Sequence, residues 1–246
     1  MPRRPTRFLT FATQRTGSSW VTAMLGSHPA VDTYGEQFDR DAKRPGSYAA
    51  FARGAEAAGG PLGRLRTTFG YLDELYAAKP QIEATGFKLM YSHAKETPTV
   101  LPYIALRRVR VVHLRRSNLL DVLVSDDTAR ARGRFHSSQA QTATVTVTID
   151  SATVLARLRG LERQVRFANW YLRAAGARMI EVRYENLVAD PRGFAAILRF
   201  LGVSEPDREL SSDLRKLNTV RKADIVVNYD EVAATLRGTP FAAFLD

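Results

Sequence analysis

Residues 13–19, Thr-Gln-Arg-Thr-Gly-Ser-Ser, combine groups that bind anions. They follow residues 7–12, which have the length and aromatic content of a buried strand, and they lead into helical spacing from Ser18 onward. A loop that enters a helix exposes free backbone N–H groups at the positive end of the helix dipole. The segment therefore predicts an anion-binding loop, with an ordinary helix-capping turn as the alternative.

The side chains of this loop strengthen the anion-binding interpretation. Gly17 lets the backbone approach a ligand closely, and Ser18 and Ser19 add hydroxyl donors. Arg15 adds a fixed positive charge with a planar set of donors. Because Gly17 is followed by two serines, without the lysine and second glycine of a Walker A loop, a magnesium-dependent kinase is disfavoured. That kinase and a non-catalytic nucleotide-binding module remain the alternatives.

The sequence of residues 13–20 resembles the 5′-phosphosulfate-binding loop of sulfotransferases that use 3′-phosphoadenosine-5′-phosphosulfate (PAPS). A second stretch, residues 113–120 followed by Val124-Ser125, resembles the family's 3′-phosphate motif, in which an arginine ends a strand and a serine lies on the next helix. Cytosolic members place the two residues eight apart. Here Arg115 and Arg116 precede Ser125 by ten and nine, so which arginine binds stays open. The Arg-Arg form resembles the bacterial carbohydrate, trehalose-type branch.

Three further stretches resemble segments of the same family in the same order. They are residues 34–38 with Gly35-Glu36, residues 86–90 with Lys88, and residues 184–191 with Tyr184-Glu185 and Asp190-Pro191. The ordered matches extend from residue 8 to residue 191, and residues 216–245 resemble the family's C-terminal region. The resemblance implies the P-loop-like sulfotransferase fold and PAPS as the donor, without a metal.

The resemblance also implies roles for individual side chains. Glu36 is the expected general base, and Arg15 and Lys88 are the expected stabilisers of the sulfuryl group and the leaving phosphate. Lys88 as a surface residue on an edge strand is the alternative. The expected donor-binding residues are Gln14, Arg15, Thr16, Gly17, Ser18, Ser19, Trp20, Arg115, Arg116, Ser125, Tyr184, Arg221 and Lys222.

The base and the acceptor are less closely defined. Met90 stands where cytosolic members carry a catalytic histidine, so His93 is the second candidate for the base. The acceptor is expected to be a hydroxyl on a sugar, glycolipid or other small natural product. Residues 39–80 and 134–149, with His136 in a polar loop, are the expected acceptor-binding segments because they lie outside the donor motifs.

The order of elements predicts an α/β fold, a mainly parallel sheet with helices on both faces, as one domain over residues 1–246. Strands are predicted at 7–12, 31–34, 85–90, 110–114 and 179–184, with an exposed strand or flap at 142–149. Helices are predicted from Ser18 to about Ser27 and at 48–58, 65–78, 100–106, 118–132, 153–175, 191–200 and 229–236.

The composition limits the classes of protein. The 246 residues carry a net charge of +11, which suits an anionic ligand, but no run of five like charges indicates a nucleic-acid tail. The absence of cysteine excludes disulfides, thiolate metal sites and a cysteine nucleophile. The chain has no apolar run of about 18 residues, so no membrane-spanning helix is predicted. We expect a cytoplasmic protein that acts on a small molecule. A homo-oligomer is compatible with the sequence.

Overall fold

The computed structural model describes residues 4–40, 45–53, 60–133, 145–205, 209–214 and 221–245. At its centre is a five-stranded sheet in the order β2-β3-β1-β4-β5, in which every pairing is parallel. The strands are β1 (Thr6–Ala12), β2 (Val31–Glu36), β3 (Ala84–Met90), β4 (Arg110–Arg115) and β5 (Met179–Arg183). The predicted mainly parallel sheet is confirmed, and because the pairing is parallel, the carboxyl ends of all five strands meet at one edge.

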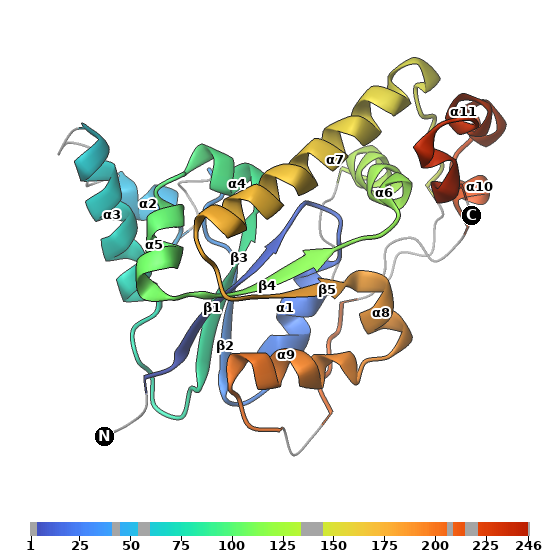
Figure 1. Cartoon of the computed structure of the whole chain (residues 1–246). Helices are drawn as coiled ribbons and strands as arrows, with labels where there is room; N and C mark the ends of the chain where they lie inside the picture. The colour runs from blue at the N-terminus through green and yellow to red at the C-terminus, as the bar shows by residue number, and fades with distance from the viewer. Residues whose placement is uncertain are drawn as a thin grey trace.

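Alternate side chains of the strands enter two different hydrophobic cores. On one face Leu9 and Phe11 pack with α3 (Gly60–Leu75), α4 (Tyr91–Glu96), α5 (Val100–Arg107) and the second half of α7 (Ser151–Ala174). On the other face Phe8 and Ala12 pack with α1 (Ser18–Gly26), α8 (Tyr184–Ala189) and α9 (Gly193–Leu201). Figure 1 shows the sheet between these two layers. Both faces are covered, as a parallel sheet requires.

A third cluster of buried side chains lies beyond the sheet. It joins α6 (Leu119–Ala131) and the start of α7 to α10 (Lys222–Ile225), α11 (Tyr229–Leu236) and the 3-10 helix Pro240–Phe244. In Figure 1 α10 and α11 lie on the right, beside α6 and the first part of α7. The C-terminal segment is therefore attached to the two helices that follow β4.

The exposed strand predicted at 142–149 is wrong for the part that the structure describes, residues 145–149. Val147 makes one isolated parallel bridge with Val226, and both Val147 and Ile149 are buried in the third cluster. The Asn228 side chain accepts a hydrogen bond from Ile149 N (3.0 Å) and donates one to Ile149 O (2.8 Å). The alternation of apolar residues therefore reflects packing against the C-terminal segment rather than a sheet.

The helices of the structure agree with the predicted helices better in their positions than in their lengths. α2 (Tyr48–Ala52) covers only the start of the predicted 48–58 helix, and residues 54–59 lie outside the described part. α3 begins at Gly60, five residues before the predicted start, because Pro61 is accommodated in the first turn of a helix instead of breaking it. The short helices α4, α8 and α10 were not predicted. Within the described ranges, no helix is long and apolar enough to cross a membrane.

His113 is a buried titratable group in the first core. It lies on β4 with no exposed surface, and its Nε2 is 2.7 Å from the Tyr91 hydroxyl. Burial lowers the pKa of His113 to about 4, against the weaker opposing effect of Glu181. The ring is therefore neutral in the folded protein at neutral pH.

We expect His113 to make the fold sensitive to acid. Between its ordinary pKa near 6.5 and about 4, the unfolded chain binds a proton that the folded chain does not, so stability falls as the pH falls through this range. From pH 7.5 to pH 4.5 the wild type should lose roughly 2–3 kcal/mol more free energy of unfolding than His113→Gln. Urea denaturation at several pH values measures this difference, and parallel curves for the two proteins would contradict it.

Candidate active site

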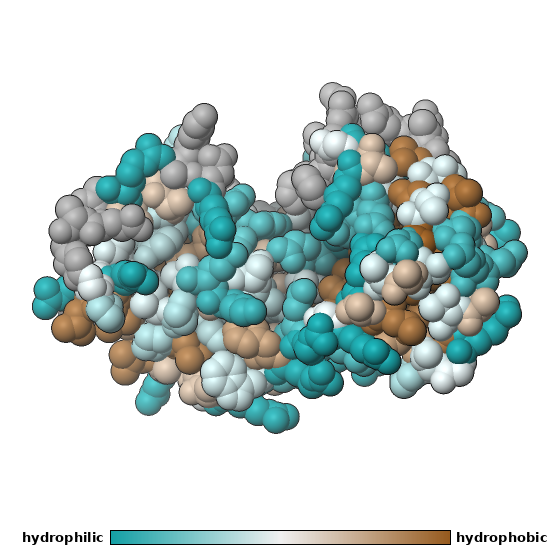
Figure 2. Space-filling view, turned by 90° about the horizontal axis from the view of Figure 1, so that it is seen from above, coloured by the Kyte–Doolittle hydropathy of each residue, from teal (hydrophilic) through white to brown (hydrophobic). Residues whose placement is uncertain are grey.

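A cavity of about 1240 Å³ lies where the carboxyl ends of the strands meet. Its walls come from the 13–20 loop, the ends of β2, β3 and β4, helices α6 and α7, Tyr184 and the C-terminal segment. Figure 2 shows a valley between two raised parts of the surface, with largely hydrophilic residues along it. The position agrees with the general rule that ligands of parallel α/β sheets bind beyond the carboxyl ends of the strands.

The 13–20 loop is held in a compact shape by its own backbone and hydroxyl groups. Gly17 has a φ of 82° and is the N-cap of α1, and Arg15 has a φ of 63°. The Thr16 hydroxyl is buried and donates to Thr13 O at 2.7 Å, so Thr16 shapes the loop but does not line the cavity. Ser18 and Ser19 do line it, at the positive end of α1. Gln14 also lines it and donates to Ser92 Oγ.

Tyr184 closes the loop from the side. A Cβ atom on Gly17 would lie 2.3 Å from Cδ2 of the Tyr184 ring, so only glycine fits between the ring and the backbone. Trp20 meets the same ring edge to face, with centroids 5.8 Å apart, and packs against Phe194 of α9. Burial raises the pKa of Tyr184, which keeps its hydroxyl protonated. Tyr184 and Trp20 thus connect the loop to the second core, and both line the cavity.

Arg15 extends from the loop toward α6. Its Nε donates to Ser125 Oγ at 3.2 Å, across 110 residues of sequence. Burial lowers the pKa of Arg15, while nearby Asp126 raises it. An arginine still remains charged at neutral pH. The contact brings the first and second sequence motifs together in one cavity.

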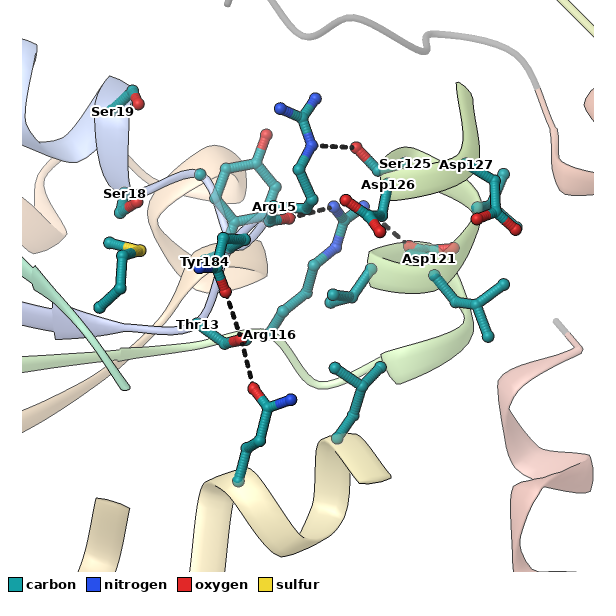
Figure 3. A pocket seen from close by; sticks show the side chains of 18 of the residues that line it. Thr13, Arg15, Ser18, Ser19, Arg116, Asp121, Ser125, Asp126, Asp127 and Tyr184 are labelled. Carbon is teal, nitrogen blue, oxygen red and sulfur yellow. Dashed lines mark hydrogen bonds and ion pairs between the residues drawn. The ribbon is translucent and has the colours of Figure 1, made fainter. Parts of the chain in front are cut away.

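Arg116 reaches the same place from the end of β4. Its Nη1 donates to Arg15 O at 3.2 Å, and its Nη2 donates to Asp121 Oδ2 at 3.0 Å. Lys222 Nζ lies 3.2 Å from the other oxygen of Asp121. Figure 3 shows the Arg15 and Arg116 side chains extending beside Tyr184 toward Ser125 and Asp121 of α6. Three cations from three separate segments therefore converge on the first two turns of α6.

The structure does not bring every expected donor-binding residue into the cavity. Arg115 is not among the lining residues, and it forms an ion pair with Glu181 of β5 at 3.0 Å. Arg221 is also outside, with its side chain 84% exposed and paired with Asp224. Of the two neighbouring arginines, Arg116 is the one that faces the cavity, since successive residues at the end of a strand point to opposite sides.

Glu36 and Lys88 form a cross-strand pair beside the loop. They are register partners in the β2–β3 pairing, after a shift in register between Tyr34 and Glu36. Lys88 Nζ lies 2.8 Å from Glu36 Oε1 and donates to Ser19 Oγ at 2.9 Å. The Lys88 side chain is 5% exposed and the Glu36 side chain 20%. Lys88 is therefore a buried cation on an inner strand, and the alternative of a surface lysine on an edge strand is wrong.

His93, the second candidate for the base, lies behind this pair. Its Nε2 is 3.9 Å from Glu36 Oε2, but His93 is buried and does not line the cavity. Burial lowers the pKa of His93, so its ring is neutral near pH 7. His113 is a core residue, and His136 lies outside the described residues.

Several lining residues were not expected from the sequence. They are Asp121, Asp126, Asp127, Arg130, Arg157, Gln164 and Leu214, whereas Asp39 falls within the expected acceptor-binding segment 39–80. A sequence signal existed for Asp121, since it lies four residues before Ser125 and so on the same face of a helix. The other residues of α6 and α7 depend on how these two helices pack, and Leu214 depends on the path of the chain after α9. Considering only residues that the structure describes, no group of three or more histidines and carboxylates is arranged to hold a metal ion.

Residues 9–207 match the model of the Sulfotransferase family. Since the match spans well over half of the 246 residues, the chain belongs to the sulfotransferase family. The family and the parallel sheet together define the fold as the P-loop-like sulfotransferase fold. The kinase alternative is not favoured. A comparison with curated protein sequences gave no match.

Solved structures of bacterial sulfotransferases are similar in fold. The chain is 16% identical to a sulfotransferase from Alicyclobacillus acidocaldarius, with a TM-score of 0.50 over 99% of this chain and 95% of that one. It is 15% identical to the sulfotransferase domain from the curacin biosynthetic pathway (TM-score 0.44, covering 99% and 84%). It is 17% identical to the sulfotransferase domain from the Synechococcus PCC 7002 olefin synthase (TM-score 0.44, covering 100% and 88%).

Replacing Gly17 tests the packing of the loop. Gly17→Ala should lower the free energy of unfolding by at least about 1–2 kcal/mol, because alanine at φ 82° is strained and its Cβ meets the Tyr184 ring. Gly160→Ala is the matched control. That glycine also lines the cavity but lies in α7 with space for a Cβ, so alanine there should stabilise by about 0.5–1 kcal/mol. Thermal and urea denaturation compare them, and equal effects at the two glycines would contradict this account.

Proposed function

We propose that this sulfotransferase moves the sulfuryl group of PAPS to a hydroxyl of a sugar, glycolipid or other small natural product. The observation that carries the proposal is the pair of cationic positions in one cavity, the 13–19 loop and the Arg116–Ser125–Lys222 cluster. PAPS has two anionic ends, a 5′-phosphosulfate and a 3′-phosphate, and needs a site for each. A loop at the start of α1 and a cluster at the start of α6 suit these two groups.

The residues present fit such a donor. Arg116 Nε is buried and has no hydrogen-bond acceptor among the described residues, with Glu185 Oε1 at 3.9 Å. The Arg116 side chain as a whole lines the cavity and is 10% exposed, and a guanidinium in a cavity wall is suited to a ligand phosphate. In this assignment Arg116, Ser125 and Lys222 hold the 3′-phosphate. Gln14, Arg15, Gly17, Ser18 and Ser19 hold the 5′-phosphosulfate.

PAPS brings an activated sulfuryl group, and the protein positions the acceptor and moves a proton. The carboxylate of Glu36 takes the proton of the acceptor hydroxyl as the new O–S bond forms. Lys88 contacts both Glu36 and Ser19, so one ammonium group adjoins the base and the phosphosulfate loop. Arg15 and Lys88 stabilise the negative charge that develops on the leaving phosphate.

Accessibility supports Glu36 rather than His93 as the base. Glu36 lines the cavity, whereas His93 lies behind it and contacts Glu36 at 3.9 Å. The Gly35-Glu36 and Arg115-Arg116 pairs also favour an acceptor of the carbohydrate kind, through their resemblance to the trehalose-type branch.

Donor binding gives the first test of the proposal. The product 3′-phosphoadenosine-5′-phosphate should raise the melting temperature without Mg²⁺. Arg116→Ala should weaken its binding by about 10- to 100-fold, since a charge-assisted contact is lost. Arg15→Ala combined with Ser125→Ala should abolish the shift at millimolar ligand. Arg115→Ala is the matched control, because Arg115 pairs with Glu181 outside the cavity and its loss should leave binding unchanged. The absence of any shift in the wild type would refute PAPS as the donor.

The role of Glu36 gives the second test. With PAPS and a metabolite extract as the source of acceptors, Glu36→Gln should reduce sulfated products by roughly 10²- to 10⁴-fold, because the general base is lost. It should retain the thermal shift with 3′-phosphoadenosine-5′-phosphate. Glu74→Gln, an exposed position on α3, is the control and should keep full turnover. Full turnover by Glu36→Gln, measured by mass spectrometry, would move the base role to His93.

A further inference from the structure

A second, smaller hollow of about 490 Å³ adjoins the cavity. The two share five lining residues, Ser19, Glu36, Asp39, Lys88 and Leu214. The hollow adds Thr22 and Ala23 from α1 and Gly35 from β2. Arg15, Arg116, Ser125, Tyr184 and Lys222 do not line it. Glu36, Lys88 and Ser19 therefore stand on the boundary between the space lined by the other donor-binding groups and a space that those other groups do not line.

This boundary has the arrangement that in-line transfer requires. The acceptor oxygen must approach the sulfuryl group opposite the leaving phosphate, with the base beside it. A molecule in the hollow reaches Glu36 and Lys88 without crossing the donor-binding groups. Volumes of a few hundred cubic ångströms are typical of sites for small molecules. The hollow is therefore a suitable site for the acceptor.

The charges of the hollow limit what it accepts. Its charged lining residues among those that the structure describes are Glu36, Lys88 and Asp39, and the first two form an ion pair at 2.8 Å. Asp39 makes no ion pair with any residue in the described ranges. The neighbouring Arg40 is paired instead with Glu96 at 3.0 Å. Among the described residues that line the hollow, Asp39 is thus the carboxylate that has no cation paired with it. It lines the same hollow as the proposed base, Glu36, and it is partly exposed.

We infer that the hollow is the acceptor site and that Asp39 selects acceptors by charge. The Asp39 carboxylate accepts a hydrogen bond from a second hydroxyl or an ammonium group of the acceptor. It disfavours acceptors that carry a carboxylate, phosphate or sulfate near the reacting hydroxyl, because like charges repel at short range. The acceptors are thus small hydroxyl compounds that are uncharged or cationic. This inference rests on the proposed sulfuryl transfer.

The absence of cysteine from the chain allows a direct measurement of the charge in the hollow. Ala23→Cys places a single thiol in its wall, and Ala77→Cys places one on the exposed surface outside both spaces. Each thiol is treated with methanethiosulfonates that carry a trimethylammonium or a sulfonate group. The cation-to-anion rate ratio should be about 5- to 10-fold higher for the Ala23→Cys variant than for the Ala77→Cys control. Adding Asp39→Asn should bring the ratio down to that of the control.

Two results of this experiment would overturn the inference. One is a rate ratio for the Ala23→Cys variant equal to or below that for Ala77→Cys. The other is a raised ratio that persists when Asp39 is replaced by asparagine, since another group would then set the potential. The measurement needs no acceptor and no turnover, so it is independent of the proposed function.

Blocking the hollow tests its role in transfer. Labelled Ala23→Cys should keep the thermal shift with 3′-phosphoadenosine-5′-phosphate. With PAPS and a metabolite extract, it should form at most about one-tenth of the sulfated products that the unlabelled Ala23→Cys variant forms. Labelled Ala77→Cys should keep both, because Ala77, although it falls within the 39–80 segment, lines neither space. Asp39→Asn should raise the share of products from anionic acceptors. Retained turnover after labelling, or mainly anionic acceptors for the wild type, would refute the inference. Loss of the thermal shift in the unlabelled protein would instead refute the proposed function.

Discussion

The parallel pairing of β1 with β3 and β4, and of β2 with β3, fixes where the candidate active site lies in this protein. It brings the loop after β1, Glu36 at the end of β2, Lys88 near the end of β3 and Arg116 after β4 to one edge of the sheet. The register makes Glu36 and Lys88 partners, and a shift at Gly35 precedes the contact. Such an irregularity redirects a side chain at the end of a strand, which suits a carboxylate in a cavity wall.

The second of the two proposed anion sites depends on a different interaction. Asp121 binds Arg116 with one oxygen and Lys222 with the other, and so joins the end of β4 to the C-terminal segment. That segment is held on α6 and α7 by the third hydrophobic cluster and by the two hydrogen bonds between Asn228 and Ile149. The third cluster therefore has a functional consequence, because it carries Lys222 into the cavity from more than 100 residues away.

Many features followed from local patterns in the sequence. The buried strands predicted at 7–12, 85–90 and 110–114 are apolar runs that local hydrophobicity identifies. The exposed strand predicted at 142–149 is wrong for its described part, residues 145–149. The alternation of valines and threonines does not say whether a strand or another segment covers the apolar side. The short helices α4, α8 and α10 have too few turns to produce a periodic pattern.

The sequence by itself determined the family resemblance and the parallel α/β class, and it predicted an anion-binding loop at 13–19, because these depend on residue type and short-range spacing. Tertiary structure decided which of two adjacent arginines faces the cavity, that Lys88 is buried beside Glu36 and that Asp39 lines a second hollow. The physical reason is that direction and burial depend on strand register and on helices distant in sequence. Spacing along the chain placed Arg115 and Arg116 equally near Ser125, and only the turn from β4 into α6 distinguishes them.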